Sequence, residues 1–237
     1  MCEKFLHDGA VTWRRCMKKH RQLALFTVAL LLAQGMAYAQ KGMDQINING
    51  QFVMAGRVGK LERVQALLDQ GAQVNSRDRN GDTPLNMATA KANTELVQAL
   101  IKAGADVNLG NLSGVTPLMG SAVTADAQSF RALLAAGAKT DPLDRVKKNA
   151  ATYAAASGCT ACLQELVKAK TDVNAKLEND LSLLMWSAAY GHEEAVRYLL
   201  SQGAERTAKD NRGKTAEVLA REGNHLGLLR LLASTEP

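Results

Sequence analysis

The chain has 237 residues, of which 46% are hydrophobic and 4% aromatic, with four cysteines and a formal net charge of +6. This length and apolar content are typical of a folded chain of one or two domains, and they exclude wholesale disorder, collagen-like repeats and a disulfide-dense scaffold. The positive charge favours a nucleic-acid partner only if it belongs to the folded part of the chain.

The N-terminus is typical of an export signal. A basic stretch over residues 14–21 precedes an apolar run over residues 23–32, and small residues follow at Ala37 and Ala39. Signal peptidases read small residues at two such positions, so we expect cleavage before Gln40.

These features predict a signal peptide over residues 1–39, a short lead over 40–46 and a folded domain over 47–237. Met17 precedes two lysines and is an alternative start of the chain. The apolar run is short for a membrane span, and an uncleaved anchor helix is the alternative interpretation. After cleavage we expect no stable membrane insertion and a periplasmic or secreted protein.

The positive charge is concentrated in the predicted signal. Residues 1–39 contain 6 of the 29 basic residues and 2 of the 23 acidic ones, which leaves a net charge of +2 for the remainder. Such a small charge lacks the electrostatic footprint that DNA binding requires. Nucleic acid is therefore not an expected partner.

A period of 33 residues runs through the rest of the chain. Gly-Ala pairs and a Thr, Ser or Asn position follow it, together with apolar series. The clearest series is the leucine at Leu67, Leu100, Leu133, Leu166, Leu199 and Leu232. Several series with one period predict a repeat architecture in which these leucines are buried at equivalent places.

One period, residues 83–108, shows the expected unit. Thr83 and Pro84 begin a short helix, because proline is tolerated at the first helical position. Asn93 or Thr94 can cap a second helix, whose apolar residues recur at helical spacing. Gly104 then ends it, since the left-handed position after a helix suits glycine. The unit is predicted to be helix, turn, helix and projecting turn.

These residues resemble the ankyrin repeat. The family's Gly-x-Thr-Pro-Leu and Gly-Ala-Asp-Val-Asn motifs stand at residues 81–85 and 104–108, and the first recurs at 114–118. The resemblance implies an all-α ankyrin-repeat solenoid of about six helix-turn-helix units with projecting β-turn loops, from about Asn47 to the C-terminus. It also implies a scaffold that binds another protein with its concave face.

The unit over residues 142–174 departs most from the family pattern. Asn149-Ala150-Ala151 replaces Thr-Pro-Leu, and Lys170 stands where glycine is expected. A lysine held at positive φ costs about 1 kcal/mol relative to glycine. This unit is therefore the weakest match, and its departures mark either a functional site or a tolerated flaw, of which we favour the flaw.

Apart from one cysteine pair, the sequence contains no catalytic, cofactor or metal motif that the repeat does not explain. His192 and His225 are the histidines that remain after residue 39, and both occupy the repeated slot that links two helices. We expect each to make a turn hydrogen bond. The protein is therefore predicted not to be an enzyme, to need no cofactor or metal and to be monomeric.

Cys159 and Cys162 lie outside the family pattern, at the start of a predicted second helix. A helix N-terminus lowers the pKa of a thiol, and the same spacing serves thioredoxin-like redox sites. The βαβ context of such sites is absent. Two interpretations remain: a structural disulfide formed in an oxidising compartment, or a redox-responsive protein that acts through the pair.

Candidate partner-binding residues occupy turns and inner helices at positions that vary between units. They are Arg77, Arg79, Asn80, Asp82, Lys91, Leu112, Val115, Arg145, Lys148, Tyr153, Trp186 and Tyr190. The arginines and lysines suggest an acidic patch on a partner protein. The alternative interpretation is that they are ordinary solvated charges, because turn tips are charged in any soluble repeat protein.

Tyr153 and Trp186 have a second interpretation. They share one register with Met54, Met87 and Leu219. Such a stripe is typical of half-buried packing, but a partly exposed aromatic side chain in a groove is also a typical anchor for a partner.

Overall fold

The computed structural model describes residues 47–233, and from Asn49 onward they form one compact unit. The predicted signal peptide over residues 1–39, the lead over 40–46 and the last four residues of the chain lie outside this range. Within residues 47–233 every regular element is a helix, and none is both long and apolar enough to cross a membrane.

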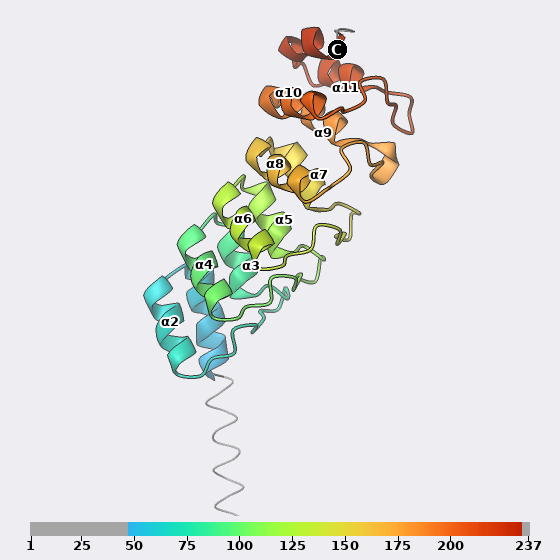
Figure 1. Cartoon of the computed structure of the whole chain (residues 1–237). Helices are drawn as coiled ribbons and strands as arrows, with labels where there is room; N and C mark the ends of the chain where they lie inside the picture. Colours follow the sequence, from blue (N-terminus) through green and yellow to red (C-terminus); the bar gives the residue numbers. More distant parts are fainter. Residues whose placement is uncertain (1–46, 234–237) are drawn as a thin grey trace, which may run out of the picture. The chain divides into compact units, whose positions relative to one another are not determined.

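The helices of this range form six consecutive pairs, which confirms the predicted all-α solenoid (Figure 1). The first pair is residues 47–58 with α2 (Leu61–Asp69). The next four are α3 (Pro84–Thr89) with α4 (Thr94–Lys102), α5 (Pro117–Val123) with α6 (Ala127–Ala135), α7 (Ala150–Ser157) with α8 (Thr160–Lys168), and α9 (Leu183–Ala189) with α10 (Glu193–Ser201). The sixth is α11 (Ala216–Glu222) with the 3₁₀ turn η2 (Leu226–Leu228) and α12 (Leu229–Ala233).

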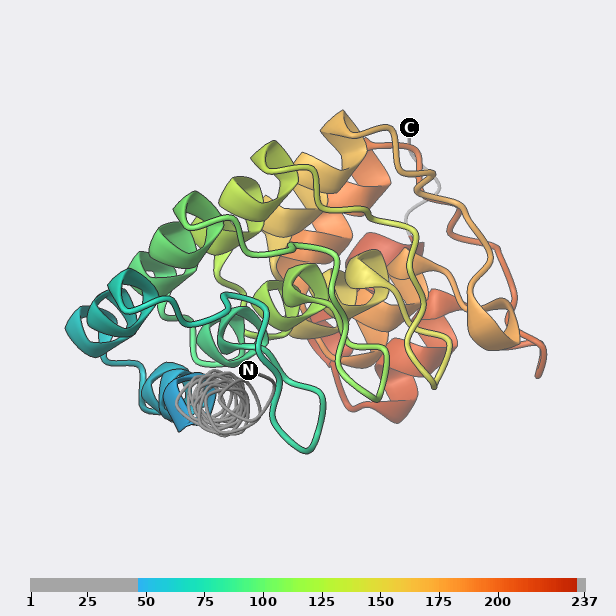
Figure 2. The ribbon, with the colours of Figure 1, turned by 90° about the horizontal axis from the view of Figure 1, so that it is seen from below.

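Two layers result from the stacking of these pairs. The first helices contact one another in the order α3, α5, α7, α9 and α11, and the second helices α2, α4, α6, α8 and α10 do the same. The long connections between pairs extend on the side of the first helices (Figures 1 and 2). We number units 1–6 in chain order, and each turn by the unit whose first helix it precedes: turns 2, 3, 4, 5 and 6 are residues 77–82, 110–115, 143–148, 176–181 and 209–214.

The repeated leucines lie in the core between the layers, as predicted. Their exposed fractions do not exceed the 5% of Leu232, and Leu67, Leu100, Leu133 and Leu199 are fully buried. Burial at one register in all six units explains why the period is so plain in the sequence. Each unit buries this face only against its neighbours.

Local capping determines where the helices begin. Thr83 accepts a hydrogen bond from the Asn86 N–H and precedes Pro84, so α3 begins where the sequence predicts. Asn93 is the residue that caps α4, through the Leu96 N–H. In unit 4 the chain holds Lys170 at a φ of 63°, which confirms the predicted left-handed lysine.

Candidate functional site between units 4 and 5

A side-chain clamp shapes four of the turns. An Asp or Asn at its base accepts two backbone N–H groups with a single oxygen, an arrangement these short side chains favour. The clamping residues are Asp78 in turn 2, Asn111 in turn 3, Asp144 in turn 4 and Asp210 in turn 6. In turn 4, Asp144 Oδ1 lies 2.9 Å from both the Val146 and the Lys148 nitrogens.

Turn 5 lacks this clamp. Leu177 occupies the slot of the clamping residue, and Asp180 occupies the slot of the turn glycine. The turn closes instead as a 3₁₀ segment, η1 (Glu178–Asp180), with Asn179 and Asp180 at φ values of 61° and 58°. Asn and Asp tolerate this left-handed region better than other residues with a side chain. Turn 5 therefore differs in shape from its neighbours.

One backbone hydrogen bond joins adjacent turns, and we call this series the backbone ladder. It is interrupted between turns 4 and 5. Leu112 N–H donates to the Asn80 carbonyl, Arg145 N–H to the Ser113 carbonyl and Asn211 N–H to the Asn179 carbonyl, all at 2.9–3.0 Å. The equivalent bond from Glu178 N–H to the Val146 carbonyl is absent from the ladder in the described part of the chain. Turns 4 and 5 are thus not joined where the other adjacent turns are.

Two clefts flank Trp186 in this region. The first, of about 120 Å³, lies between turns 4 and 5 and is lined by Val146, Lys147, Lys148, Thr152, Leu177, Glu178, Asn179, Leu181 and Trp186. The second, of about 250 Å³, lies toward unit 6 and is lined by Leu181, Met185, Trp186, Ala189, Tyr190, Arg212 and Leu219. We call the two together the Trp186 groove.

Aromatic rings and one ammonium group gather in the groove. Lys148 Nζ lies 4.6 Å from the centroid of the Trp186 ring and 5.8 Å from that of Tyr153, which is cation–π geometry. The rings of Trp186 and Tyr190 are stacked with centroids 6.0 Å apart, and Tyr190 is 54% exposed. The groove therefore presents apolar surface beside a positive charge.

Tyr153 connects α7 to turn 4. Its hydroxyl donates to Asp144 Oδ2 at 2.5 Å, so Asp144 uses its second oxygen here after clamping the turn with the first. Burial and the adjacent Asp144 carboxylate raise the pKa of Tyr153 to about 12. The neutral phenol is the form that donates this bond.

The pKa of Tyr153 predicts a pH-dependent contribution to stability. Because the folded pKa is raised above 10.0, the contribution is fully present below pH 10 and is lost as the pH rises toward 12. We expect the wild type to melt at a higher temperature than Tyr153→Phe at pH 8, and the difference to shrink above pH 10. Thermal unfolding followed by circular dichroism between pH 8 and 11.5 measures it. A difference that stays constant over this range contradicts the assignment.

The predicted partner-binding residues fall into two groups. Lys148, Trp186 and Tyr190 line the Trp186 groove, and Tyr153 adjoins it through its contact with Lys148. The others lie on turns 2–4 and at the C-terminal end of α3.

Several members of the second group hold neighbouring units together. Arg77 donates to the Gly110 carbonyl, and Lys91 donates to the Arg57 carbonyl. Asp82 accepts from the Asn111 side chain at 2.8 Å. Such side chains are already engaged in contacts between units, which the sequence alone does not reveal.

The remaining members of that group differ in exposure. Asn80 contributes its backbone to the turn ladder, Leu112 is 55% exposed and Val115 is half-buried. Arg79 and Arg145 are exposed, and no side-chain partner contacts either of them within residues 47–233. They are available for contact with another molecule.

Sequence reasoning missed several residues of the groove lining as components of a site, among them Leu177 and Leu181. Leu177 had a detectable signal, because it replaces an Asp or Asn that recurs at 33-residue intervals in turns 2, 3, 4 and 6.

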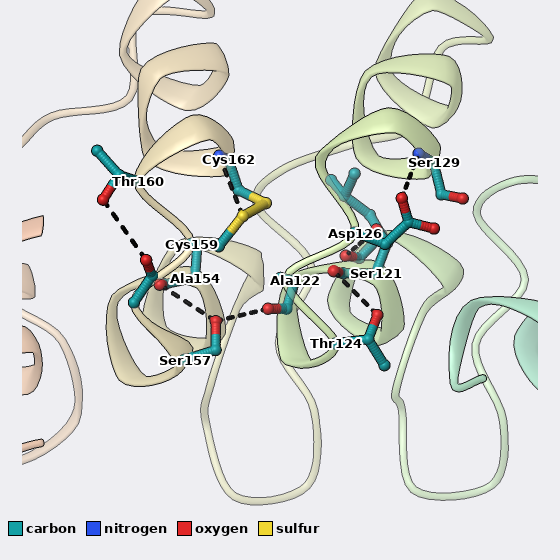
Figure 3. The surroundings of a disulfide bond; sticks show 12 residues. Ser121, Ala122, Thr124, Asp126, Ser129, Ala154, Ser157, Cys159, Thr160 and Cys162 are labelled. Atoms are coloured by element: carbon teal, nitrogen blue, oxygen red, sulfur yellow. Dashed lines mark hydrogen bonds between the residues drawn. A yellow bond between two sulfur atoms is a disulfide. The ribbon is translucent and has the colours of Figure 1, made fainter. Parts of the chain in front are cut away.

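The two cysteines lie at the start of α8, the second helix of unit 4 (Figure 3). Cys159 and Cys162 form a disulfide, and both are buried, with exposed fractions of 4% and 0%. Cys159 Sγ accepts from the Cys162 N–H at 3.2 Å, in the slot where Asp126 caps α6 through the Ser129 N–H. The cysteine pair thus replaces the ordinary cap of a second helix.

The sequence predicts a turn hydrogen bond for each histidine, and the structure shows that each bond instead joins two units. His192 Nε2 lies 2.8 Å from the Ala156 carbonyl and His225 Nε2 lies 3.1 Å from the Ala189 carbonyl, so each links its unit to the preceding one. Over residues 47–233, no cluster of three or more His, Cys, Asp or Glu side chains has the arrangement of a metal site.

Comparison with protein families places the repeated part of the chain in one of them. A family model described as ankyrin repeats (3 copies) covers residues 52–145 and 151–237, which is most of the repeated part of the chain. A comparison with curated proteins finds no match.

Proposed function

Because the chain belongs to the ankyrin repeat family, whose repeats mediate protein–protein interaction, we propose that it is a protein-binding scaffold that uses the Trp186 groove. The observation that carries the proposal is the position of Trp186, between two clefts and beside a turn that departs from the repeat. Ankyrin repeat proteins are generally non-catalytic, and we propose that this chain performs no catalysis.

Partly exposed tryptophans in desolvated clefts commonly dominate binding energy, so Trp186 is the expected anchor. Trp186→Ala is expected to reduce capture of a partner from an extract of the producing cells by at least about tenfold, which corresponds to about 1.4 kcal/mol. Affinity capture with quantified bound protein measures this.

Tyr198→Ala provides the matched control, because it truncates a half-buried aromatic side chain of α10, in the other helix layer. It is expected to leave capture unchanged. Circular dichroism verifies that both variants are folded. Equal capture by the wild type and a folded Trp186→Ala variant would contradict this choice of surface.

The scaffold is further proposed to act outside the cytoplasm, in the periplasm or as a secreted protein. The order of basic, apolar and small residues before Gln40 supports export. The disulfide between Cys159 and Cys162 is consistent with it, because disulfides persist in oxidising compartments. N-terminal sequencing of the mature protein is expected to begin at Gln40 or within a few residues. Recovery of the intact chain from the soluble cytoplasm would refute export.

The redox-responsive alternative has less support. Exchange requires a thiolate or a disulfide sulfur that another molecule can reach, and Cys159 and Cys162 are both buried. We therefore propose a structural role for the pair, as the cap of α8.

A further inference from the structure

We propose that the Trp186 groove takes an extended, acidic segment of the partner protein, with two apolar side chains at positions i and i+2 on either side of the Trp186 ring. This inference rests on the proposed function and adds the chemistry of the bound segment to it. In this arrangement the segment also carries an Asp or Glu next to its first apolar residue, and the carboxylate of that Asp or Glu lies over turn 4.

The sizes of the two clefts suit individual side chains. An apolar cavity of about 150 Å³ holds a benzene molecule, so the cleft of about 120 Å³ suits a residue of the size of valine or leucine. The cleft of about 250 Å³ suits a larger, aromatic side chain. Trp186 and Leu181 line both clefts and form the ridge between them.

An extended segment matches this pair of clefts. Alternate side chains of such a segment point to the same side and repeat at roughly 6–7 Å, because the rise is 3.2–3.4 Å per residue. Two side chains at i and i+2 can therefore lie on opposite sides of one indole ring. A helical segment would instead present neighbours at i+3 and i+4.

The interrupted ladder offers main-chain contacts to the same segment. The Val146 carbonyl and the Glu178 N–H lack the bond that their counterparts make in the other adjacent turns of the described chain. Exposed backbone groups of this kind pair with the main chain of an extended peptide. They lie beside the smaller cleft, where the first apolar side chain is placed.

The charges near the groove select an acidic segment. Arg145, Lys147 and Lys148 all belong to turn 4, and none of them forms a salt bridge within residues 47–233. By contrast, Arg212 at the second cleft is paired with Asp210 at 2.7 Å. The carboxylates of Glu178 and Asp180 lie on turn 5, so a carboxylate of the segment is favoured on the turn 4 side.

Selection from a displayed library of random 12-residue peptides, with the full chain as the target, tests the inference. We expect at least tenfold enrichment of peptides that carry Asp or Glu next to two apolar residues separated by one position. The Lys148→Glu variant is expected to select peptides with Lys or Arg at that place instead. Arg131→Glu, a charge reversal at an exposed residue of α6 in the other helix layer, is expected to keep the acidic preference.

Circular dichroism and the melting temperature verify that each variant is folded, and Arg145→Glu replaces Lys148→Glu if the latter does not fold. Enrichment of basic or uncharged peptides, no enrichment, or an acidic preference that survives the folded reversal on turn 4 overturns the inference. If partner capture still depends on Trp186 in that case, the proposed function stands and only the chemistry of the segment is wrong.

Discussion

Leu133→Ala is expected to lower the free energy of unfolding by about 2–5 kcal/mol. Leu133 is fully buried in α6, near the middle of the stack. Its α6 helix packs between α4 and α8, which carry Leu100 and Leu166 at the same register. Truncation therefore leaves a cavity that neighbouring units cannot fill without moving. Urea unfolding followed by circular dichroism measures the loss.

Val123→Ala is the control for this prediction. Val123 lies at the end of α5 in the same unit and is 51% exposed, so its truncation is expected to change stability by no more than about 0.5 kcal/mol. Similar losses for the two variants would refute the burial register on which the six-unit alignment depends.

Asp144→Ala is expected to cost about 2–3 kcal/mol, because it leaves several donors without their acceptor. Asp144 is 6% exposed, and it accepts from the Val146 and Lys148 backbone N–H groups and from the Tyr153 hydroxyl. Its removal is also expected to release turn 4 from its present position beside Trp186. Urea unfolding gives the stability, and the partner-capture assay gives the effect on the groove.

The chain supplies its own control for this change. Asn111 clamps turn 3 with one amide oxygen in the way that Asp144 clamps turn 4. Asp144→Asn is therefore expected to keep the turn and to cost less than half as much as Asp144→Ala. An equal loss in the two variants would show that the charge of Asp144, rather than its clamp, holds turn 4.

The sequence predicted the fold because the residues that determine it, the buried and capping positions, recur at fixed intervals. Each unit has to bury the same face against its neighbours, so Leu67 and its counterparts repeat every 33 residues. Local chemistry also determines the caps at Thr83 and Asn93 and the left-handed Lys170, since each depends on a few adjacent residues. The signal peptide over residues 1–39 remains a prediction.

The tertiary structure decided the site. The sequence placed Lys148 and Trp186 in separate units, and only the packing of α7 against α9 brings the ammonium group over the ring. The tertiary structure likewise brings Arg77 and Lys91 to backbone carbonyls of neighbouring units. A long polar side chain has many acceptors within reach, and which one it takes depends on the neighbouring unit. Burial repeats with the period, whereas these contacts depend on side chains that differ from one unit to the next.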